Sequence, residues 1–203
     1  MTSKPFHHGN LREVLLQQAE VMLRDDGVDG LSLRELARQA GVSHGAPRSH
    51  FIDRQALLDA LAEQGFNRFT ERVVAAMSGG GTFAEQGKRV GRAYVDFAVD
   101  EAALMELMFA AKTGDSSGRV QDAAARLFQV LDDAIGTPAA TVAERDARER
   151  FKLVFAAAMQ GTATLIVSRR ISRSQGEVIV ADATSMLLTS ELGTTVLRTR
   201  WHE

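Results

Sequence analysis

The residues best suited to specific chemistry gather between Leu31 and Arg54. This segment holds four arginines against one glutamate and one aspartate, a net charge of +2. The whole chain of 203 residues has a formal charge of −2, so the remainder carries −4. Guanidinium groups bind phosphates and guanine edges through paired hydrogen bonds, and His44 and His50 add further donors. A locally positive segment in an acidic chain indicates contact with nucleic acid.

The sequence gives little support for a catalytic site or a metal site. The chain has no cysteine, which excludes disulfides, thiolate metal ligands and cysteine nucleophiles. The glycines at 79–81 lack the Lys-Ser/Thr of a phosphate loop. The adjacent His7 and His8 would point to different sides of a helix, so they make a poor metal site. We therefore expect neither an enzyme nor a metal or other cofactor.

The basic segment has the pattern of a helix-turn-helix. Ser32 is expected to cap one short helix, with Glu35 three residues later, and Gly41 is expected to end it. Val42 then packs the turn, and a second short helix is predicted from about 43 to 50. In this motif the second helix enters the major groove while the first crosses the backbone. The small residues at 43–47 suit a helix that must enter a narrow groove.

The rest of the chain also has the apolar spacing of helices and no credible strand. Capping boxes are expected at Ser32–Glu35, Thr82–Glu85, Thr141–Glu144 and Ser174–Glu177. Asp100 is expected to cap another helix, and the glycine run at 79–81 is expected to form a flexible joint. The predicted helices are 11–26, 32–40, 43–50, one that starts at 53 and includes 66, 82–97, 100–109, 119–135, 141–171 and 174–191. The fold class is therefore all-α, with an N-terminal three-helix helix-turn-helix domain, a C-terminal helical bundle and about nine helices.

The stretch from His7 to Phe66 resembles the N-terminal domain of the TetR family of regulators. The resemblance rests on HHGNLRE, on Gly27, on LSLRELARQAGVS across the turn, and on HFIDRQALL at 50–58. It implies a DNA-binding domain at 1–66, followed by an effector-binding and dimerisation domain at 67–203. The DNA contacts it implies are Ser32, Leu33, Arg34, Ser43, His44, Gly45, Ala46, Pro47, Arg48, His50 and Arg54. By the same resemblance, Ser32 and Arg54 would bind phosphates.

One residue departs from the family pattern. Relatives usually read Y-R-H-F where this chain reads Arg48-Ser49-His50-Phe51, and that tyrosine commonly contacts a phosphate. Arg48 could replace the contact through its charge, or could bind a guanine edge and change the preferred sequence. Weakened DNA binding is the other interpretation. It would leave a helical protein–protein interaction module, which is the alternative function.

The C-terminal part resembles the family less specifically. The segment 94–109 is similar to a subgroup that often carries Trp-His-Gly, where this chain has Met159-Gln160-Gly161. Bulky apolar residues with a few polar groups suit an effector pocket, although each could equally be an ordinary core residue. The candidate pocket residues are Tyr94, Phe97, Met105, Met108, Phe109, Phe128, Phe155, Met159 and Gln160.

The two last predicted helices are expected to form a homodimer interface. Helix 141–171 carries a run of small residues, including Ala157 and Gly161, and helix 174–191 offers apolar positions such as Val178 and Met186. Two such pairs would form a four-helix bundle, unless helix 141–171 is simply buried within one subunit. The expected partners are therefore a second copy, a palindromic duplex DNA and a small-molecule effector.

The remaining expectation concerns location and the sign of regulation. The longest mostly apolar stretch, 153–167, is shorter than the ~20 residues of a membrane span, and no signal peptide is recognised at the start. We expect a cytoplasmic protein that does not enter a membrane. Because most members of the family repress, a repressor released by its effector is the predicted function.

Overall fold

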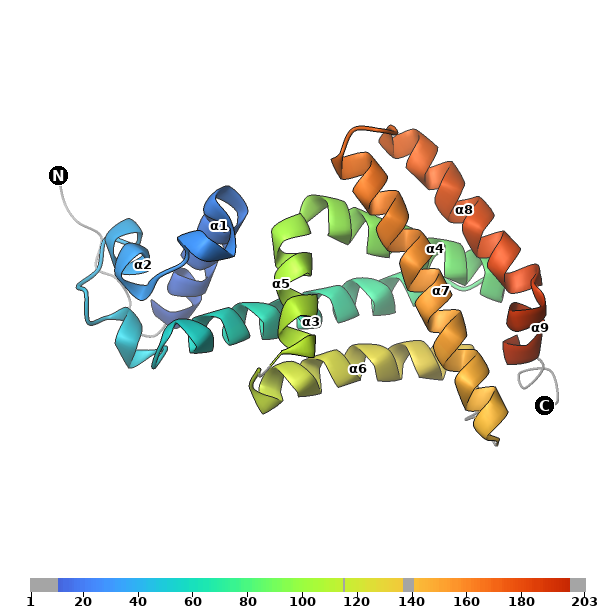
Figure 1. Ribbon diagram of the computed structural model, residues 1–203, viewed down its shortest axis with the longest axis horizontal. Helices are drawn as coiled ribbons and strands as arrows, with labels where there is room; N and C mark the ends of the chain where they lie inside the picture. Colours follow the sequence, from blue (N-terminus) through green and yellow to red (C-terminus); the bar gives the residue numbers. More distant parts are fainter. Residues whose placement is uncertain (1–10, 115, 137–140, 198–203) are drawn as a thin grey trace. The chain divides into compact units, whose positions relative to one another are not determined.

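A computed structural model describes residues 11–114, 116–136 and 141–197, and over these ranges the chain is helical with no strand (Figure 1). The predicted all-α class is therefore confirmed. The elements are α1 (Leu11–Gly30), α2 (Leu33–Gln39), a 3₁₀ turn η1 (Pro47–Ser49), α3 (Arg54–Met77), α4 (Phe83–Asp100), α5 (Ala102–Thr113), α6 (Gly118–Ile135), α7 (Val142–Val167), α8 (Arg173–Thr189) and α9 (Glu191–Leu197).

The chain divides into two compact units. The first comprises residues 1–66 and 101–124, and the second comprises residues 67–100 and 125–203. The long helices α3 and α6 each contribute residues to both units. The first unit thus contains the predicted DNA reader together with α5, which lies well outside it in sequence. No helix in the described ranges has both the length and the hydropathy needed to cross a membrane.

The core of the first unit is built from α1, α2, α5 and the first part of α3. Fully buried side chains recur at helical spacing on α1 and α3, as the apolar periodicity predicts. Gly65 lets α3 and α5 approach closely, because a Cβ there would lie 2.6 Å from Met108 Sδ. Phe66 and Phe109 meet edge to face with their centroids 6.0 Å apart. These contacts fix α5 against the end of α3 that belongs to the same unit.

The core of the second unit lies among α4, α7 and α8, which pack against one another. Gly91 of α4 is a point of close approach, since a Cβ there would lie 2.9 Å from both Met159 Sδ and Val180 Cγ1. A smaller apolar cluster joins Ile135, Ala147 and Phe151 to Val196 of α9. The residues after 191, whose structure the sequence leaves ambiguous, therefore include a short packed helix up to Leu197.

Two of the predicted capping boxes are present and one is misplaced. At Thr82–Glu85 and Thr141–Glu144 the hydroxyl oxygen accepts from the backbone N–H of the glutamate, whose carboxylate accepts from the backbone N–H of the threonine. The box predicted at Ser174 is wrong, because α7 ends at Val167 and α8 begins early enough for Ser172 and Gln175 to form it. Asp100 is also no cap: it ends α4 and accepts from Arg173 Nη2 at 2.6 Å.

The glycine run at 79–81 forms a tight turn, contrary to the expected flexible joint. Arg89 donates through Nε to Ala76 O at 2.8 Å and through Nη2 to Gly80 O at 2.6 Å. Gly80 and Gly81 have positive φ angles of 64° and 88°, which glycine adopts without strain. The glycines therefore permit a sharp reversal, and Arg89 donates to one carbonyl at the end of α3 and to one in the turn.

Candidate nucleic-acid interface

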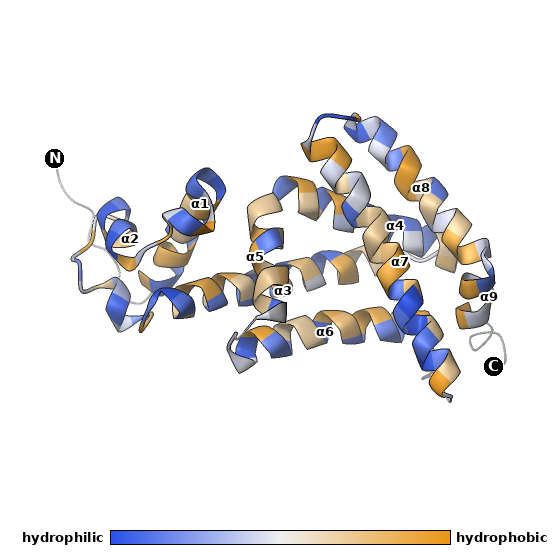
Figure 2. Cartoon of the chain, in the orientation of Figure 1, coloured by the Kyte–Doolittle hydropathy of each residue, from blue (hydrophilic) through white to orange (hydrophobic). Residues whose placement is uncertain are grey.

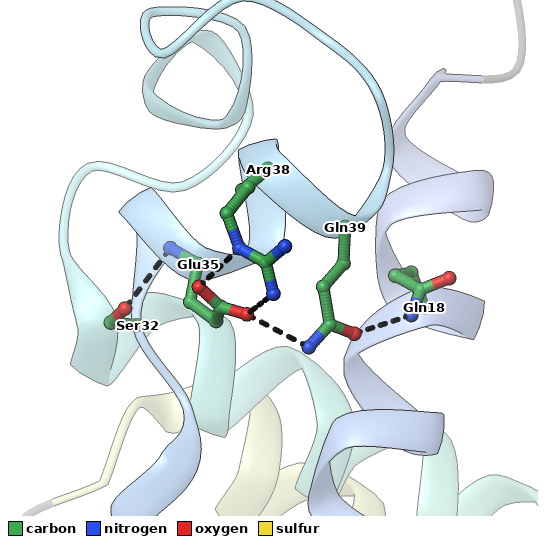
Figure 3. A network of polar contacts seen from close by, with 5 residues as sticks. All are labelled: Gln18, Ser32, Glu35, Arg38 and Gln39. Atoms are coloured by element: carbon green, nitrogen blue, oxygen red, sulfur yellow. Dashed lines mark hydrogen bonds and ion pairs between the residues drawn. The ribbon is translucent and has the colours of Figure 1, made fainter.

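Helix α2 is positioned by a chain of polar contacts that begins at its cap (Figure 3). Ser32 Oγ accepts from the backbone N–H of Glu35 at 3.1 Å. The Glu35 carboxylate then accepts from Arg38 and Gln39, and Gln39 Oε1 accepts from Gln18 of α1 at 2.9 Å. The cap predicted at Ser32 is therefore present, but Glu35 uses its carboxylate to link α2 to α1 rather than to complete a capping box.

The same network sets the charge on the surface of α2. The Arg38 guanidinium, and secondarily the Gln39 amide, lower the pKa of Glu35 from its usual 4.5 to about 2. The carboxylate is thus ionised at neutral pH, and Arg38 faces its own counter-ion. Arg34 makes no such contact, so it is the more available cation on α2.

The helix predicted at 43–50 is wrong in its extent. Backbone hydrogen bonds join residues three apart: Ala46 N–H donates to Ser43 O, and His50 N–H donates to Pro47 O. These bonds form tight turns, and within this segment only residues 47–49 form a helix, of the 3₁₀ type. An α-helix starting at Ser43 would need an N–H at position 47, which proline lacks. Gly41, with φ of 67°, turns the chain out of α2, and Val42 N–H bonds back to Ala37 O at 3.0 Å.

The predicted DNA contacts divide by exposure. The buried side chains of Leu33 and Pro47 face the core of the unit, so these two residues could offer only their backbone to a ligand. Ser32 and Ala46 are half-buried. The exposed members of the set are Arg34, Ser43, His44, Gly45, Arg48, His50 and Arg54. Buried anchors thus alternate with exposed polar side chains along one short segment.

The exposed arginines and histidines of this set, apart from Arg54, have no internal partner. Within the described ranges, Arg34, His44, Arg48 and His50 make no side-chain hydrogen bond or ion pair. Ser49, between Arg48 and His50, instead donates its hydroxyl to Ala46 O at 2.7 Å and stabilises the turn. The segment therefore presents cationic and donor groups to solvent from a backbone that is itself held in place.

Arg54 differs from the other predicted contacts because its guanidinium is already engaged. Its Nε donates to Leu31 O at 2.7 Å, and its Nη2 donates to Val28 O at 2.6 Å. The resemblance implied a phosphate contact at this position, and spacing in the sequence gave no sign of the carbonyl contacts. A phosphate role for Arg54 remains a prediction.

The predicted effector residues lie in both units. Met105, Met108 and Phe109 belong to the first unit, and the other six belong to the second. In the second unit Tyr94 Oη donates to Gln160 Oε1 at 3.2 Å, and burial raises the tyrosine pKa to about 12. Phe69, which the sequence interpretation did not include, stacks on Phe97 with centroids 4.9 Å apart and meets Tyr94 edge to face. These contacts are those of a packed aromatic cluster.

A second exposed surface is apolar and lies on α7 and α8. Beyond its first turn, helix α7 has a hydrophilic part followed by a mostly hydrophobic part (Figure 2), and its densest run of charges is 144–150. Its exposed large apolar side chains include Leu153 at 67 % and Val167 at 52 %, and α8 adds Val178 at 61 % and Met186 at 71 %. Gly161 of α7 is also exposed, with nothing within 4 Å of a Cβ placed on it. We call this set the α7–α8 face.

Comparison with known proteins matches both parts of the chain. Residues 15–61 match the model of bacterial regulatory proteins of the tetR family, and residues 88–186 match that of the tetracyclin repressor-like C-terminal domain. The class C tetracycline repressor protein of Escherichia coli is 46 % identical over 52 residues, which are 26 % of this chain and 24 % of that protein. The matched segment thus spans about a quarter of that relative's length.

Solved structures extend the similarity to nearly the whole chain. A Rhodococcus sp. RHA1 protein of unknown function is 37 % identical with a TM-score of 0.77, covering 91 % of this chain and 97 % of that one. A bacterial regulatory protein in the tetR family from Rhodococcus RHA1 has the same fold at 17 % identity, with a TM-score of 0.66 and coverage of 87 % and 94 %. With both family models matched in order along one chain, the protein belongs to the TetR family of bacterial regulatory proteins.

Proposed function

We propose that the protein is a sequence-specific DNA-binding transcriptional regulator that acts as a homodimer. Residues 1–66 would read DNA, and residues 67–203 would bind an effector and form the dimer. The observation that carries the proposal is the segment 31–54, where Arg34, His44, Arg48 and His50 are exposed without an internal partner. Exposed donors on a fixed backbone are what phosphate and base-edge contacts require.

We assign each exposed residue a proposed DNA contact from its position in the segment 31–54 and its exposure. Arg48 and His44 lie in the turn segment 43–50, which would enter the major groove, and Arg48 would bind a guanine edge or a phosphate. Ser32 and Arg34, at the start of α2, would contact the backbone. Leu33 and Pro47 support these contacts by anchoring the segment to the core of the first unit.

The α7–α8 face is the proposed dimer interface. Large apolar side chains exposed together on two packed helices mark an interaction site on a protein surface. The open side of Gly161 and its exposed neighbour Ala157 would let a second helix approach closely. Two helices from each copy would form a four-helix bundle about a two-fold axis. Paired readers about 34 Å apart would then bind a palindromic operator.

Repression with release by a small molecule is the proposed mode of regulation. An effector that binds one conformation of the dimer better would lower operator affinity by a coupling of roughly 1–3 kcal/mol. The aromatic cluster around Tyr94, Phe97 and Gln160 is where we would place an effector, because it combines apolar side chains with a polar pair. A regulator acts where the chromosome is, so the proposed location is the cytoplasm.

Selection from a random duplex library tests the proposal. Repeated binding to the full-length protein and sequencing of the retained DNA should yield a palindrome with half-sites about one helical turn apart or a multiple of that distance. Enrichment of a single half-site would contradict the dimeric mode of reading. A folded protein that enriches no sequence would contradict DNA-binding regulation and favour a protein–protein interaction module.

A further inference from the structure

The Arg54 guanidinium joins the beginning of one helix to the junction of two others. Arg54 is the first residue of α3, directly after Asp53, whose Oδ1 accepts from Ala56 N–H at 2.8 Å. Its two carbonyl partners, Val28 O and Leu31 O, lie 26 and 23 residues earlier in the chain. All of these residues belong to the first unit.

The partner carbonyls lie at the end of α1 and just before α2. Gly27, with φ of 69°, breaks the helical conformation of α1, and Val28 to Gly30 form one last helical turn before α2. Carbonyls at the end of a helix lack intrahelical donors, and the negative end of the helix dipole favours a cation there. Val28 O accepts from Leu31 N–H at 3.1 Å and also from Arg54. Arg54, which lies outside this turn in sequence, therefore supplies an additional donor to the Val28 carbonyl.

The turn leads directly into the DNA-facing residues. Leu31 is buried, and the next residue, Ser32, caps α2. A donor on Leu31 O thus fixes the peptide that precedes the cap, one residue before the proposed phosphate contact. Displacement of the first turn of α3 would pull on this peptide through the guanidinium.

We infer that Arg54 is a positioning residue, whose two carbonyl contacts hold the start of α2 in its DNA-binding position relative to the start of α3. This inference rests on the proposed DNA-binding function but assigns Arg54 a different role from a phosphate contact. The planar fork of arginine can donate to two separate acceptors, whereas a lysine ammonium is a single point of charge. Substitution by lysine therefore keeps the positive charge and removes the two-acceptor geometry, so the two contributions can be measured separately.

The first test is amide hydrogen exchange of the full-length protein without DNA. Arg54→Lys should raise exchange several-fold at residues 31–37 and leave the centre of α1, residues 15–23, unchanged. Arg89→Lys removes a similar two-carbonyl contact from the second unit and is the matched control. It should raise exchange near 76–81 and not at 31–37. Two results in Arg54→Lys would overturn the inference: an unchanged exchange rate at residues 31–37, or an equal rise in exchange rate at residues 31–37 and 15–23.

The second test measures operator affinity against salt concentration. If Arg54 acts by positioning, Arg54→Lys and Arg54→Gln should both weaken binding by about tenfold, with the salt slope of the wild type. A phosphate contact alone would leave Arg54→Lys close to the wild type, and Arg54→Gln would lower the slope by about 0.9. That second pattern would overturn the positioning role. Failure of the wild type to bind DNA would contradict the proposed function. The hydrogen-exchange result would still show whether the Arg54 contacts with the carbonyls of Val28 and Leu31 hold the start of α2.

A measurement on the wild type covers the case in which the lysine variant does not fold. The Arg54 Nε–H should give a slowly exchanging resonance in ¹⁵N spectra of the deuterated protein, with a coupling across the hydrogen bond to the Leu31 carbonyl. Rapid exchange of that proton with solvent would contradict the contact and with it the inference.

Discussion

Two surfaces of the molecule lack an internal partner, and they differ in chemistry. In the first unit the segment 31–54 exposes arginines and histidines between buried anchors such as Leu33 and Pro47. In the second unit the α7–α8 face exposes Leu153, Val178 and Met186. Exposed charge costs little in water, whereas a clustered apolar surface is normally covered.

The difference indicates which kind of partner each surface suits. The polar segment can stay solvated until it meets a polyanion, so its binding should depend strongly on salt. The apolar face gains free energy from burial alone, so its association should depend weakly on salt. One protein can then form a permanent dimer through the second surface and bind DNA reversibly through the first.

The largest expected effect comes from blocking the α7–α8 face. Gly161→Glu should fit within a single subunit, because nothing lies within 4 Å of the added Cβ, but would place a bulky charge where the second copy approaches. We expect a monomer and a loss of operator affinity of about 100-fold or more, since two linked half-site contacts become one. Sedimentation and anisotropy titration would measure the two effects.

Gly118→Glu is the matched control for that experiment. Gly118 is also a helical glycine with open space around its Cβ position, but it lies at the start of α6 in the first unit. This variant should remain dimeric with nearly unchanged operator affinity. A dimeric Gly161→Glu protein would show that the apolar face serves some other partner.

The next largest effect should come from Arg48→Ala. Loss of a paired contact to a base edge costs roughly 1–3 kcal/mol and relaxes the preference at one position of the operator. The control is Arg38→Ala, whose guanidinium is already paired with Glu35 and should contribute less to DNA binding. Titration against operators substituted at each base pair would compare them. Equal losses for the two variants would remove the special role of Arg48.

The smallest effect concerns Glu35 and acid stability. Because folding lowers the pKa of Glu35 from 4.5 to about 2, its stabilising contribution is present above pH 4.5 and is lost as the pH falls towards 2. Glu35→Gln should therefore flatten the decrease in unfolding free energy over this range, measured by denaturant titration at several pH values. Glu71→Gln, at an exposed position on α3, is the control and should follow the wild type. An identical pH profile for Glu35→Gln and the wild type would contradict the assignment.

The same substitution bears on the comparison of surfaces. Removing the Glu35 charge frees Arg38 from its counter-ion. If Arg38 then meets a phosphate, the salt slope of DNA binding should steepen by about 0.9. An unchanged slope would place Arg38 beyond the reach of the DNA backbone.

Much of the fold could be predicted because its signals are local. Apolar spacing identifies the helices, and Ser32, Thr82 and Thr141 cap helices where the sequence places them. The extent of the helix at 43–50 was wrong because the missing N–H of Pro47 outweighed its favourable neighbours. The box at Ser174 was wrong because two overlapping candidates, at 172 and 174, differ only in where α7 ends.

The contacts that position the site could not be predicted from spacing. The donors of Arg54 and Arg89 reach carbonyls that are distant in sequence or lie in a turn, and backbone carbonyls carry no residue-specific signal. The exposure of apolar side chains could not be predicted either. Leu153 and Phe151 are both apolar residues of α7, yet Leu153 is 67 % exposed and Phe151 is buried. Which face of an apolar helix remains exposed to solvent depends on the other helices that pack against it.

The most direct test of the central claim is an anisotropy titration of the purified protein. The probe would be duplex DNA from upstream of its own gene, at two salt concentrations, with nonspecific duplex as competitor. Binding that survives the competitor and weakens steeply with salt, at two protomers per duplex, is the predicted result. A folded dimer that binds this duplex and the selected palindrome no better than random DNA would contradict the account.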